Sequence, residues 1–360
     1  MLDHLQAQTT LIRSSSFSTP VSPISIDQAL SNVEQLRGKV VVITGAAGVG
    51  FGAAYSKKVA RYGKVRPPRA LAKVILSDLK IEAVQEVVDE IRAAGGEATG
   101  IACNVLDWDA QVRMFRHAID TYGKVDIVFA NAGTSSETQN PLLGDETDEN
   151  GEPKKPAMTT LDVNTTGAIY TVKLGFYHLA RNPAKTGKSI VILGSMASFF
   201  GIPGAPLYSA SKHAVLGLMR SMYHNAKAER ISLSTINPFF CLTGIFGFDA
   251  LLALSGIPLA TIDDVVGAMI YASTAVNLDA GKAEEINGSS FLVDWKGIVQ
   301  IPYNSTAGSS AASLEVGSTA PKGYYRVFED RASLPIYSGK FIKDFINAFK
   351  SLIWDPRRRA

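Results

Sequence analysis

Short runs rich in β-branched residues alternate along the chain with longer stretches in which apolar residues recur at helical spacing. The short runs predict strands within residues 38–44, 72–80, 97–105, 125–133, 187–198, 229–239 and 289–295. Amphipathic segments between them predict helices, one of which is stopped by Gly95 and Gly96. This order is typical of an α/β fold of the Rossmann type, with a doubly wound parallel sheet of about seven strands flanked by helices. Ligands of such sheets bind at the carboxyl ends of the strands.

The pattern delimits one domain with two terminal extensions. Residues 1–37 are rich in Ser and Thr and predict a flexible arm, residues 38–300 the Rossmann domain, and residues 301–360 a linker and a helical tail. Apolar residues from Phe341 to Ile353 recur at helical spacing, with polar residues opposite and three arginines after them. Such a helix can lie on a membrane surface. Docking on the domain itself or on a neighbouring subunit is the alternative, which we favour.

Composition excludes several classes of function. The formal net charge is +3 and the basic residues are scattered, so no nucleic-acid footprint is visible. The two cysteines, Cys103 and Cys241, lie far apart, which favours a reducing compartment, and no spacing of histidines or cysteines indicates a metal site. No signal peptide is evident. Polar and helix-breaking residues interrupt the apolar stretch 239–260, so we read it as buried rather than membrane-spanning, and expect a cytoplasmic protein.

A glycine-rich segment, TGAAGVGFG, follows the first strand and opens the first helix of the domain. Glycine allows tight turns and close approach of the backbone to a pyrophosphate, whose charge is favoured at a helix N-terminus. A plain turn is the alternative, but the strand–loop–helix context favours dinucleotide binding. The glycines are Gly45, Gly48, Gly50 and Gly52.

Asp78 ends the second predicted strand, where an acidic residue bonds the adenosine ribose and repels a 2′-phosphate. This favours NAD over NADP. The alternative is that Asp78 caps the next helix. An insertion, residues 64–71, carries Arg66 and Arg69, which can supply a phosphate site and so keep NADP open.

Taken together, the motifs resemble the short-chain dehydrogenase/reductase family over about residues 38–297. The resemblance rests on the glycine loop, NAG at 131–133, DVN at 162–164, Ser195, YSASK at 208–212, and Asn237-Pro238 with Thr243. Within the family, the chain is most similar to hydroxyprostaglandin-dehydrogenase-like and alcohol-dehydrogenase-like members. The resemblance implies an NAD(P) site made of Gly45, Gly48, Gly50, Phe51, Gly52, Asp78, Asn104, Val105, Asn131, Ala132, Gly133, Tyr208, Lys212, Pro238 and Thr243.

Three positions depart from the family pattern. The glycine loop has one extra residue, so that Gly50, Phe51 and Gly52 stand for its last three positions. Asn104 replaces the usual aspartate after the third strand, and its amide can still bond adenine. Phe239 replaces the glycine of the family's Pro-Gly pair, and we expect it to crowd the nicotinamide side.

The reaction indicated is hydride transfer with a tyrosine as general acid/base. Tyr208 and Lys212 share one face of a helix, and an ammonium nearby lowers a phenol pKa from about 10 towards neutrality. The family implies that Lys212 also holds the nicotinamide ribose and that Asn164 anchors a water in a proton relay. Ser195, at the end of the preceding strand, would hold the substrate oxygen.

For several of these residues a structural role, without any part in catalysis, stays open. Tyr208 and Lys212 can be a surface pair, Ser195 a strand-end hydroxyl, and Asn164 a helix residue bonded to backbone. Asn164 also begins a glycosylation sequon, NTT, which we read as accidental. For His213 we expect a structural role rather than a catalytic one.

Apolar loops after Ser195 and Asn237 predict a pocket for a small lipophilic alcohol or ketone, although the same residues can pack on the core or on a partner subunit. The second loop is also a candidate lid. The family implies a homodimer or homotetramer built on the helices that carry Asn164 and Tyr208. Two alternatives to an NAD-dependent alcohol dehydrogenase remain: an NADPH-dependent ketoreductase of secondary metabolism, and a catalytically weak NAD-binding regulator or scaffold.

Overall fold

The computed structural model describes residues 23–60, 71–135, 141–143, 146–202, 204–241, 243, 259–274 and 286–303. Their strands form one eight-stranded sheet in the order β3-β2-β1-β4-β5-β6-β7-β8. Seven strands are parallel, and β8 pairs antiparallel with β7. The strands are β1 (Val40–Thr44), β2 (Lys73–Asp78), β3 (Glu97–Ala102), β4 (Ile127–Ala130), β5 (Ser189–Leu193), β6 (Ser232–Pro238), β7 (Ser290–Asp294) and β8 (Gly297–Ile301). The predicted fold class is confirmed.

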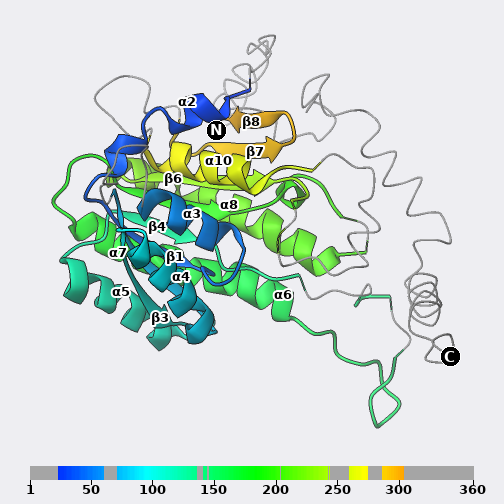
Figure 1. The fold of residues 1–360 in the computed structure, drawn as a ribbon. Helices are drawn as coiled ribbons and strands as arrows, with labels where there is room; N and C mark the ends of the chain where they lie inside the picture. Colours follow the sequence, from blue (N-terminus) through cyan, green and yellow to red (C-terminus); the bar gives the residue numbers. More distant parts are fainter. Residues whose placement is uncertain are drawn as a thin grey trace, which may run out of the picture.

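Helices cover both faces of the sheet (Figure 1). One layer contains α2 (Ile26–Leu30), α3 (Phe51–Ala60), α4 (Ile81–Ala93) and α10 (Ile262–Thr274). The other contains α5 (Trp108–Tyr122), α7 (Ala168–Arg181) and α8 (Pro206–Ala228). Alternate residues of β1 serve the two layers: Val41 and Ile43 belong to the first core, Val40 and Val42 to the second. A strand buried on both faces must be apolar throughout, which is why β1 reads as a continuous apolar run.

The strand β8 and the docking of the N-terminal segment were not predicted. Ile24 pairs with Ile298 of β8 through two backbone hydrogen bonds of 2.7 and 3.4 Å. After it, α2 and the 3₁₀ turn η1 (Val33–Leu36) bury Ala29, Val33 and Leu36 in the first core. The prediction of a flexible arm over residues 1–37 is therefore wrong for residues 23–37, because a few buried apolar side chains anchor a segment whose composition is polar.

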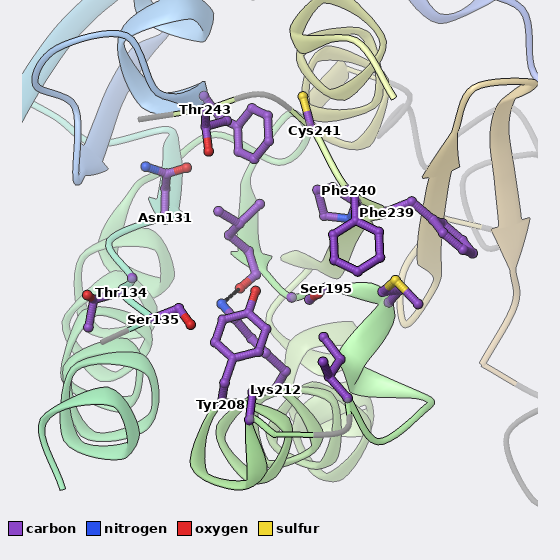
Figure 2. Close-up of a pocket in the computed structure, with 18 residues that line it drawn as sticks. Asn131, Thr134, Ser135, Ser195, Tyr208, Lys212, Phe239, Phe240, Cys241 and Thr243 are labelled. Carbon is purple, nitrogen blue, oxygen red and sulfur yellow. Dashed lines mark hydrogen bonds between the residues drawn. The ribbon is translucent and has the colours of Figure 1, made fainter. Parts of the chain in front are cut away.

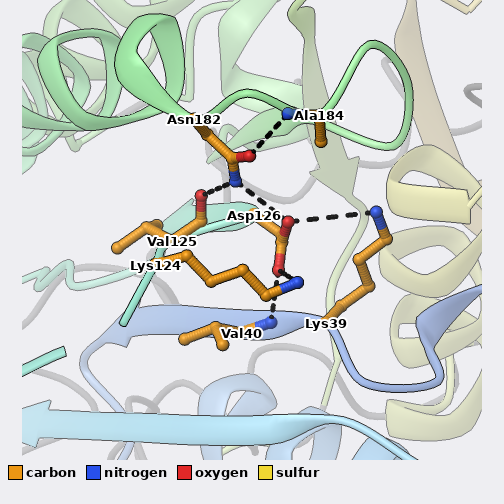
Figure 3. A network of polar contacts seen from close by, with 7 residues as sticks. All are labelled: Lys39, Val40, Lys124, Val125, Asp126, Asn182 and Ala184. Atoms are coloured by element: carbon orange, nitrogen blue, oxygen red, sulfur yellow. Dashed lines mark hydrogen bonds and ion pairs between the residues drawn. The ribbon is translucent and has the colours of Figure 1, made fainter. Parts of the chain in front are cut away.

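A polar network joins the amino ends of the strands, at the edge of the sheet opposite the predicted site (Figure 3). Asp126, which is fully buried just before β4, accepts hydrogen bonds from the backbone N–H of Val40 at 2.9 Å and from Asn182 Nδ2 at 3.0 Å. Its carboxylate also pairs with Lys124 at 2.9 Å and lies 3.9 Å from Lys39 Nζ. This carboxylate links β1, β4 and the end of α7.

Several predicted segments lie partly or wholly outside the described residues: the arginine insertion, residues 244–258 of the proposed lid, and the C-terminal tail. The charged loop before α6 (Thr159–Leu161) lies on the surface as predicted, with residues 147–155 exposed, and it projects from the domain as a small hairpin (Figure 1). Of the helices that the structure describes, none has the length and apolarity needed to span a membrane.

Candidate active site

A hollow opens where β4, β5 and β6 end beside helix α8 (Figure 2). It holds about 870 Å³ of empty space, open solvent at its mouth included. Many of the predicted site residues line it, and these come from segments far apart in sequence: Phe51, Asn131, Gly133, Ser195, Tyr208, Lys212, Pro238 and Thr243.

Tyr208 and Ser195 face each other in this hollow. Pro206 begins α8, a position that suits the fixed φ of proline, and places Tyr208 in the first turn of the helix. Ser195 follows β5 and caps a short 3₁₀ turn, its Oγ accepting a hydrogen bond of 3.2 Å from the N–H of Ala197. Burial raises the pKa of Tyr208 above its usual value, and a side-chain hydrogen bond with Ser195 offsets part of that rise.

Lys212 lies one helical turn after Tyr208, as the spacing predicted. Its Nζ donates a hydrogen bond of 2.9 Å to the carbonyl oxygen of Leu193 and lies 5.5 Å from the centre of the Tyr208 ring. The side chain is 4% exposed, and burial lowers its pKa to about 8. We predicted a lowered pKa for Tyr208, but on balance the pKa is raised, because desolvation is the largest influence on this group, as it is on Lys212.

Asn164 lies in a π-helical turn, η2 (Asp162–Gly167), which separates α6 from α7. Its Oδ1 accepts a 2.8 Å hydrogen bond from the N–H of Thr134, and its Nδ2 donates to the Thr134 carbonyl at 2.9 Å and to Ser211 Oγ at 3.0 Å. Both amide atoms therefore have protein partners. Such π turns are frequent at functional sites, and the predicted role in anchoring a water stays a prediction.

The glycine loop is held tightly against the NAG segment. Gly45 has a φ of +68°, and a Cβ there would lie 2.6 Å from Ala132 Cα. Asn131 Nδ2 donates to the carbonyls of Thr44 and Gly45, both at 2.8 Å. Its Oδ1 is buried and has no hydrogen-bond partner among the described residues. Asn131 thus fixes the shape of the loop.

The end of the loop accommodates the extra residue. Helix α3 begins at Phe51, which agrees with aligning the last three loop positions at residues 50–52. A Cβ at Gly52 would lie 2.5 Å from the Gly45 carbonyl, whereas Gly48, at φ +67°, and Gly50 face open space. The loop is therefore closely packed on one side and open on the other.

Asp78 faces the glycine loop. Its Oδ2 accepts a hydrogen bond of 3.3 Å from the N–H of Ala47, and its Oδ1 accepts one of 2.8 Å from the N–H of Leu79. The residue at the N-cap position of α4 is Lys80, so Asp78 does not cap that helix. This removes the alternative interpretation of Asp78 and places a carboxylate beside the predicted phosphate loop.

Two predicted cofactor residues lie at the end of β3. Asn104 is exposed, and its Oδ1 accepts a 3.0 Å hydrogen bond from the N–H of Leu106. Val105 is buried, and a Cβ at Gly167 would come within 2.6 Å of it, so this valine packs beneath the π-helical turn. Neither residue lines the hollow.

Phe239 contributes to the wall of the hollow but is only 8% exposed. It belongs to an apolar cluster with Leu292 and Ile301, and its ring meets that of Trp295 edge-on at 6.4 Å. Figure 2 shows the rings of Phe239 and Phe240 pointing in different directions. The cluster at β7 and β8 thus accommodates a ring where the family has glycine, and crowding of the nicotinamide side by Phe239 stays a prediction.

The rest of the wall is mostly apolar. Lys212 is the only ionisable lysine, arginine, aspartate or glutamate among the described residues that line the hollow. Cys241 also lines it, and burial raises the pKa of that thiol to about 11, which makes it a poor nucleophile.

His213 is exposed, with its Nδ1 2.9 Å from the Ser209 carbonyl, and does not line the hollow. Among the residues described, no group of His, Cys, Asp and Glu is arranged to hold a metal ion.

The short-chain dehydrogenase family model matches residues 39–249. The chain belongs to this family. Family membership was predicted from the motifs, and it identifies the protein as an oxidoreductase acting on CH–OH groups and binding NAD(P). The narrower resemblance to hydroxyprostaglandin-dehydrogenase-like members stays a prediction.

Related short-chain dehydrogenases come from fungi and plants. The short-chain dehydrogenase/reductase prx4 of Penicillium roqueforti is 31% identical over 68% of this chain and 68% of its own length. The secoisolariciresinol dehydrogenase of Forsythia intermedia is 29% identical over 72% of this chain and 89% of its own. The versicolorin reductase stcU of Emericella nidulans is 30% identical over 59% and 72%.

Solved structures of the family share the fold. The 3-ketoacyl-(acyl-carrier-protein) reductase of Brucella melitensis, complexed with NADH, superposes with a TM-score of 0.58. It is 25% identical and covers 72% of this chain and 98% of its own.

Sequence reasoning missed some residues of the site. Thr134 and Ser135 line the hollow, and Ser211 accepts a hydrogen bond from Asn164. Ile202, which also lines it, belongs to the loop after Ser195 that was predicted to form the pocket. Ser211 lies inside the YSASK motif, so its position was visible, but its partner on another helix was not. Loop residues such as Thr134 carry no periodic signal that would mark them.

Proposed function

We propose that this short-chain dehydrogenase interconverts a lipophilic secondary alcohol and its ketone, using NAD(H) and Tyr208 as general acid/base. The observation that carries the proposal is the meeting of Tyr208 and Ser195 hydroxyls in an apolar hollow, with the buried ammonium of Lys212 beneath the tyrosine ring. A protein that only bound a dinucleotide would have no need of this trio.

The residues present fit a nicotinamide dinucleotide. The close contacts at Gly45 and Gly52 leave no room for side chains where the loop meets Asn131, and the loop precedes the N-terminus of α3. The carboxylate of Asp78 beside Ala47 favours ribose hydroxyls over a 2′-phosphate, which supports NAD. The bound nicotinamide supplies the hydride for ketone reduction, or accepts it in alcohol oxidation.

In the reducing direction, the side chains of this chain hold the ketone and deliver a proton. Ser195 and Tyr208 donate hydrogen bonds to the ketone oxygen, where negative charge develops. Because burial raises the pKa of Tyr208, its phenol is protonated at neutral pH and is ready to donate. Lys212, with a pKa of about 8, is cationic at neutral pH and stabilises the phenolate that remains.

The lining of the hollow supports a lipophilic and uncharged substrate. Met196, Ile202, Phe240 and Cys241 line it beside the two hydroxyls, and no acidic side chain among the described residues faces it. A carboxylate or phosphate group would be desolvated there without a partner other than Lys212. A neutral ketone needs only the two hydrogen bonds to its oxygen.

A second candidate function is reduction in secondary metabolism with NADPH. One fungal relative supports it: the versicolorin reductase stcU is named for the reducing direction of its reaction. Asp78 opposes NADPH, and Arg66 and Arg69 lie outside the described residues. The third interpretation, a scaffold without activity, is opposed by the intact trio of Ser195, Tyr208 and Lys212.

The test begins with titration of the purified protein with NADH and with NADPH, following nicotinamide fluorescence. We expect NADH to bind at least ten-fold more tightly, and Asp78→Asn to reduce that preference. Turnover is then measured with matched neutral and carboxylated aromatic ketones. Preference for NADPH supports the second function, whereas binding without turnover of any ketone supports the scaffold.

We also propose a homodimer or homotetramer, with a cytoplasmic location. Ile169 and Tyr177 expose 42% and 46% of their surface on α7, one of the two helices expected at the interface. Light scattering after size exclusion tests the assembly: a monomer at micromolar concentration would remove it.

A further inference from the structure

We infer that Ser211 is a positioning residue, which joins Asn164 to the catalytic turn of α8 and so fixes the pocket wall relative to Tyr208. The inference rests on the proposed function of Tyr208. Ser211 itself does not line the hollow and touches no reacting atom.

A chain of hydrogen bonds carries the inference. Ser211 Oγ donates to the carbonyl oxygen of Tyr208 at 2.7 Å and accepts from Asn164 Nδ2 at 3.0 Å. The same Asn164 side chain also forms hydrogen bonds with the backbone N–H and C=O of Thr134, which lines the hollow. One buried hydroxyl thus connects the backbone of the general acid/base to the loop after β4.

Burial makes this connection stiff. Ser211 is fully buried and Asn164 is 1% exposed, so water does not compete for these hydrogen bonds. A Cβ at Gly133 would lie 3.1 Å from Asn164 Oδ1 and 3.6 Å from Lys212 Nζ. The loop, the asparagine and the lysine are therefore packed within contact distance of one another, and a shift of one is transmitted to the others.

Helix α8 offers a matched control. Ser221 makes the same bond to the carbonyl three residues before it, from Oγ to Leu218 O at 2.9 Å, but it is exposed. Ser221→Ala removes this type of local bond alone. Ser211→Ala removes the local bond and the link to Asn164, so the difference between the two variants isolates the link.

The experiment measures reduction of neutral aromatic ketones by NADH, together with NADH affinity, in wild type, S211A, S221A, N164A and S211A/N164A. We expect S211A to lower kcat about ten-fold while the Kd for NADH changes less than two-fold, and S221A to match wild type. If Ser211 acts through Asn164, the double variant loses no more kcat than N164A. Ser211→Thr, which keeps the hydroxyl, should recover most of the lost kcat.

Results that contradict the role of Ser211 can be told apart from results that contradict the proposed function. Equal kcat in S211A and S221A, or independent losses from S211A and N164A, overturns the inference while leaving the proposed function standing. An absence of wild-type turnover with every ketone removes the proposed function and this inference with it. A fall in kcat that follows a loss of NADH affinity, without rescue by Ser211→Thr, marks a merely structural serine.

Discussion

Lys212 donates its hydrogen bond to the carbonyl oxygen of Leu193, at the end of β5, rather than to the hydroxyl of Tyr208 one turn away. The ammonium therefore acts on the tyrosine through space, from 5.5 Å below the ring. Burial removes water from the Lys212 ammonium, and this desolvation should lower the free energy of unfolding of the protein.

Lys212→Met is expected to stabilise the folded protein at neutral pH. The pKa of Lys212 is about 8 when folded, against 10.5 when unfolded, so the unfolded chain binds more protons between these values. Stability of the wild type should therefore rise with pH across that window. The variant should be more stable by up to about 3 kcal/mol at pH 7, and the difference should shrink towards pH 10. Urea unfolding at both pH values tests this, and a difference independent of pH would contradict it.

Ser195→Ala should move the pH profile of alcohol oxidation to higher pH. Oxidation needs the Tyr208 phenolate, so its rate rises as pH increases through the pKa of Tyr208. The hydrogen bond with Ser195 lowers that pKa, and its removal lets burial raise the pKa further. The pKa of Tyr208 lies above its usual value of about 10, so the profile of kcat/KM is followed from pH 8 to 11 to locate the midpoint for each protein. A midpoint in S195A at or below that of the wild type would count against the assigned hydrogen bond.

Gly45→Ala should abolish NADH binding. The added methyl would lie 2.6 Å from Ala132 Cα, and φ is +68° there, so the loop must shift away from Asn131. Gly217→Ala on helix α8 is the control, because nothing lies within 4 Å of its Cβ position. We expect the Kd for NADH to rise more than 100-fold in G45A and to stay unchanged in G217A. Normal NADH affinity in a folded G45A would show that the loop does not hold the cofactor.

Asp126→Ala should destabilise the fold without altering the chemistry. It leaves the Val40 N–H and the Asn182 amide without their buried acceptor, which costs about 2–4 kcal/mol. Lys124→Ala removes only a half-exposed partner and should cost less than about 1 kcal/mol. Denaturant unfolding measures both changes. Because the network lies at the amino ends of the strands, kcat below the unfolding transition should match wild type, and a lower kcat in D126A would contradict this placement.

Much of the fold and the site was predictable because both depend on local patterns. Strand–helix alternation determines a parallel sheet, and the sheet brings Asn131, Ser195 and Pro238 to one edge as the ends of neighbouring strands. The spacing of Tyr208 and Lys212 places them one turn apart on one helix. These features need no knowledge of distant contacts.

The features that could not be predicted from the sequence depend on contacts between residues far apart along the chain. Ile24 is ordered by Ile298, and the ring of Phe239 is accommodated by Leu292 and Trp295. The pKa of Tyr208 was misjudged for the same reason, since spacing shows a neighbouring charge but not the depth of burial. Local pattern carries no information on any of these.

The central claim is that Tyr208 exchanges the proton with the substrate, and Tyr208→Phe tests it most directly. Phenylalanine keeps the ring and removes the hydroxyl, so NADH should bind with unchanged affinity. Single-turnover oxidation of bound NADH by a neutral aromatic ketone should slow by about 10²–10⁴-fold. A Tyr208→Phe variant that binds NADH and transfers hydride at the wild-type rate would contradict the account.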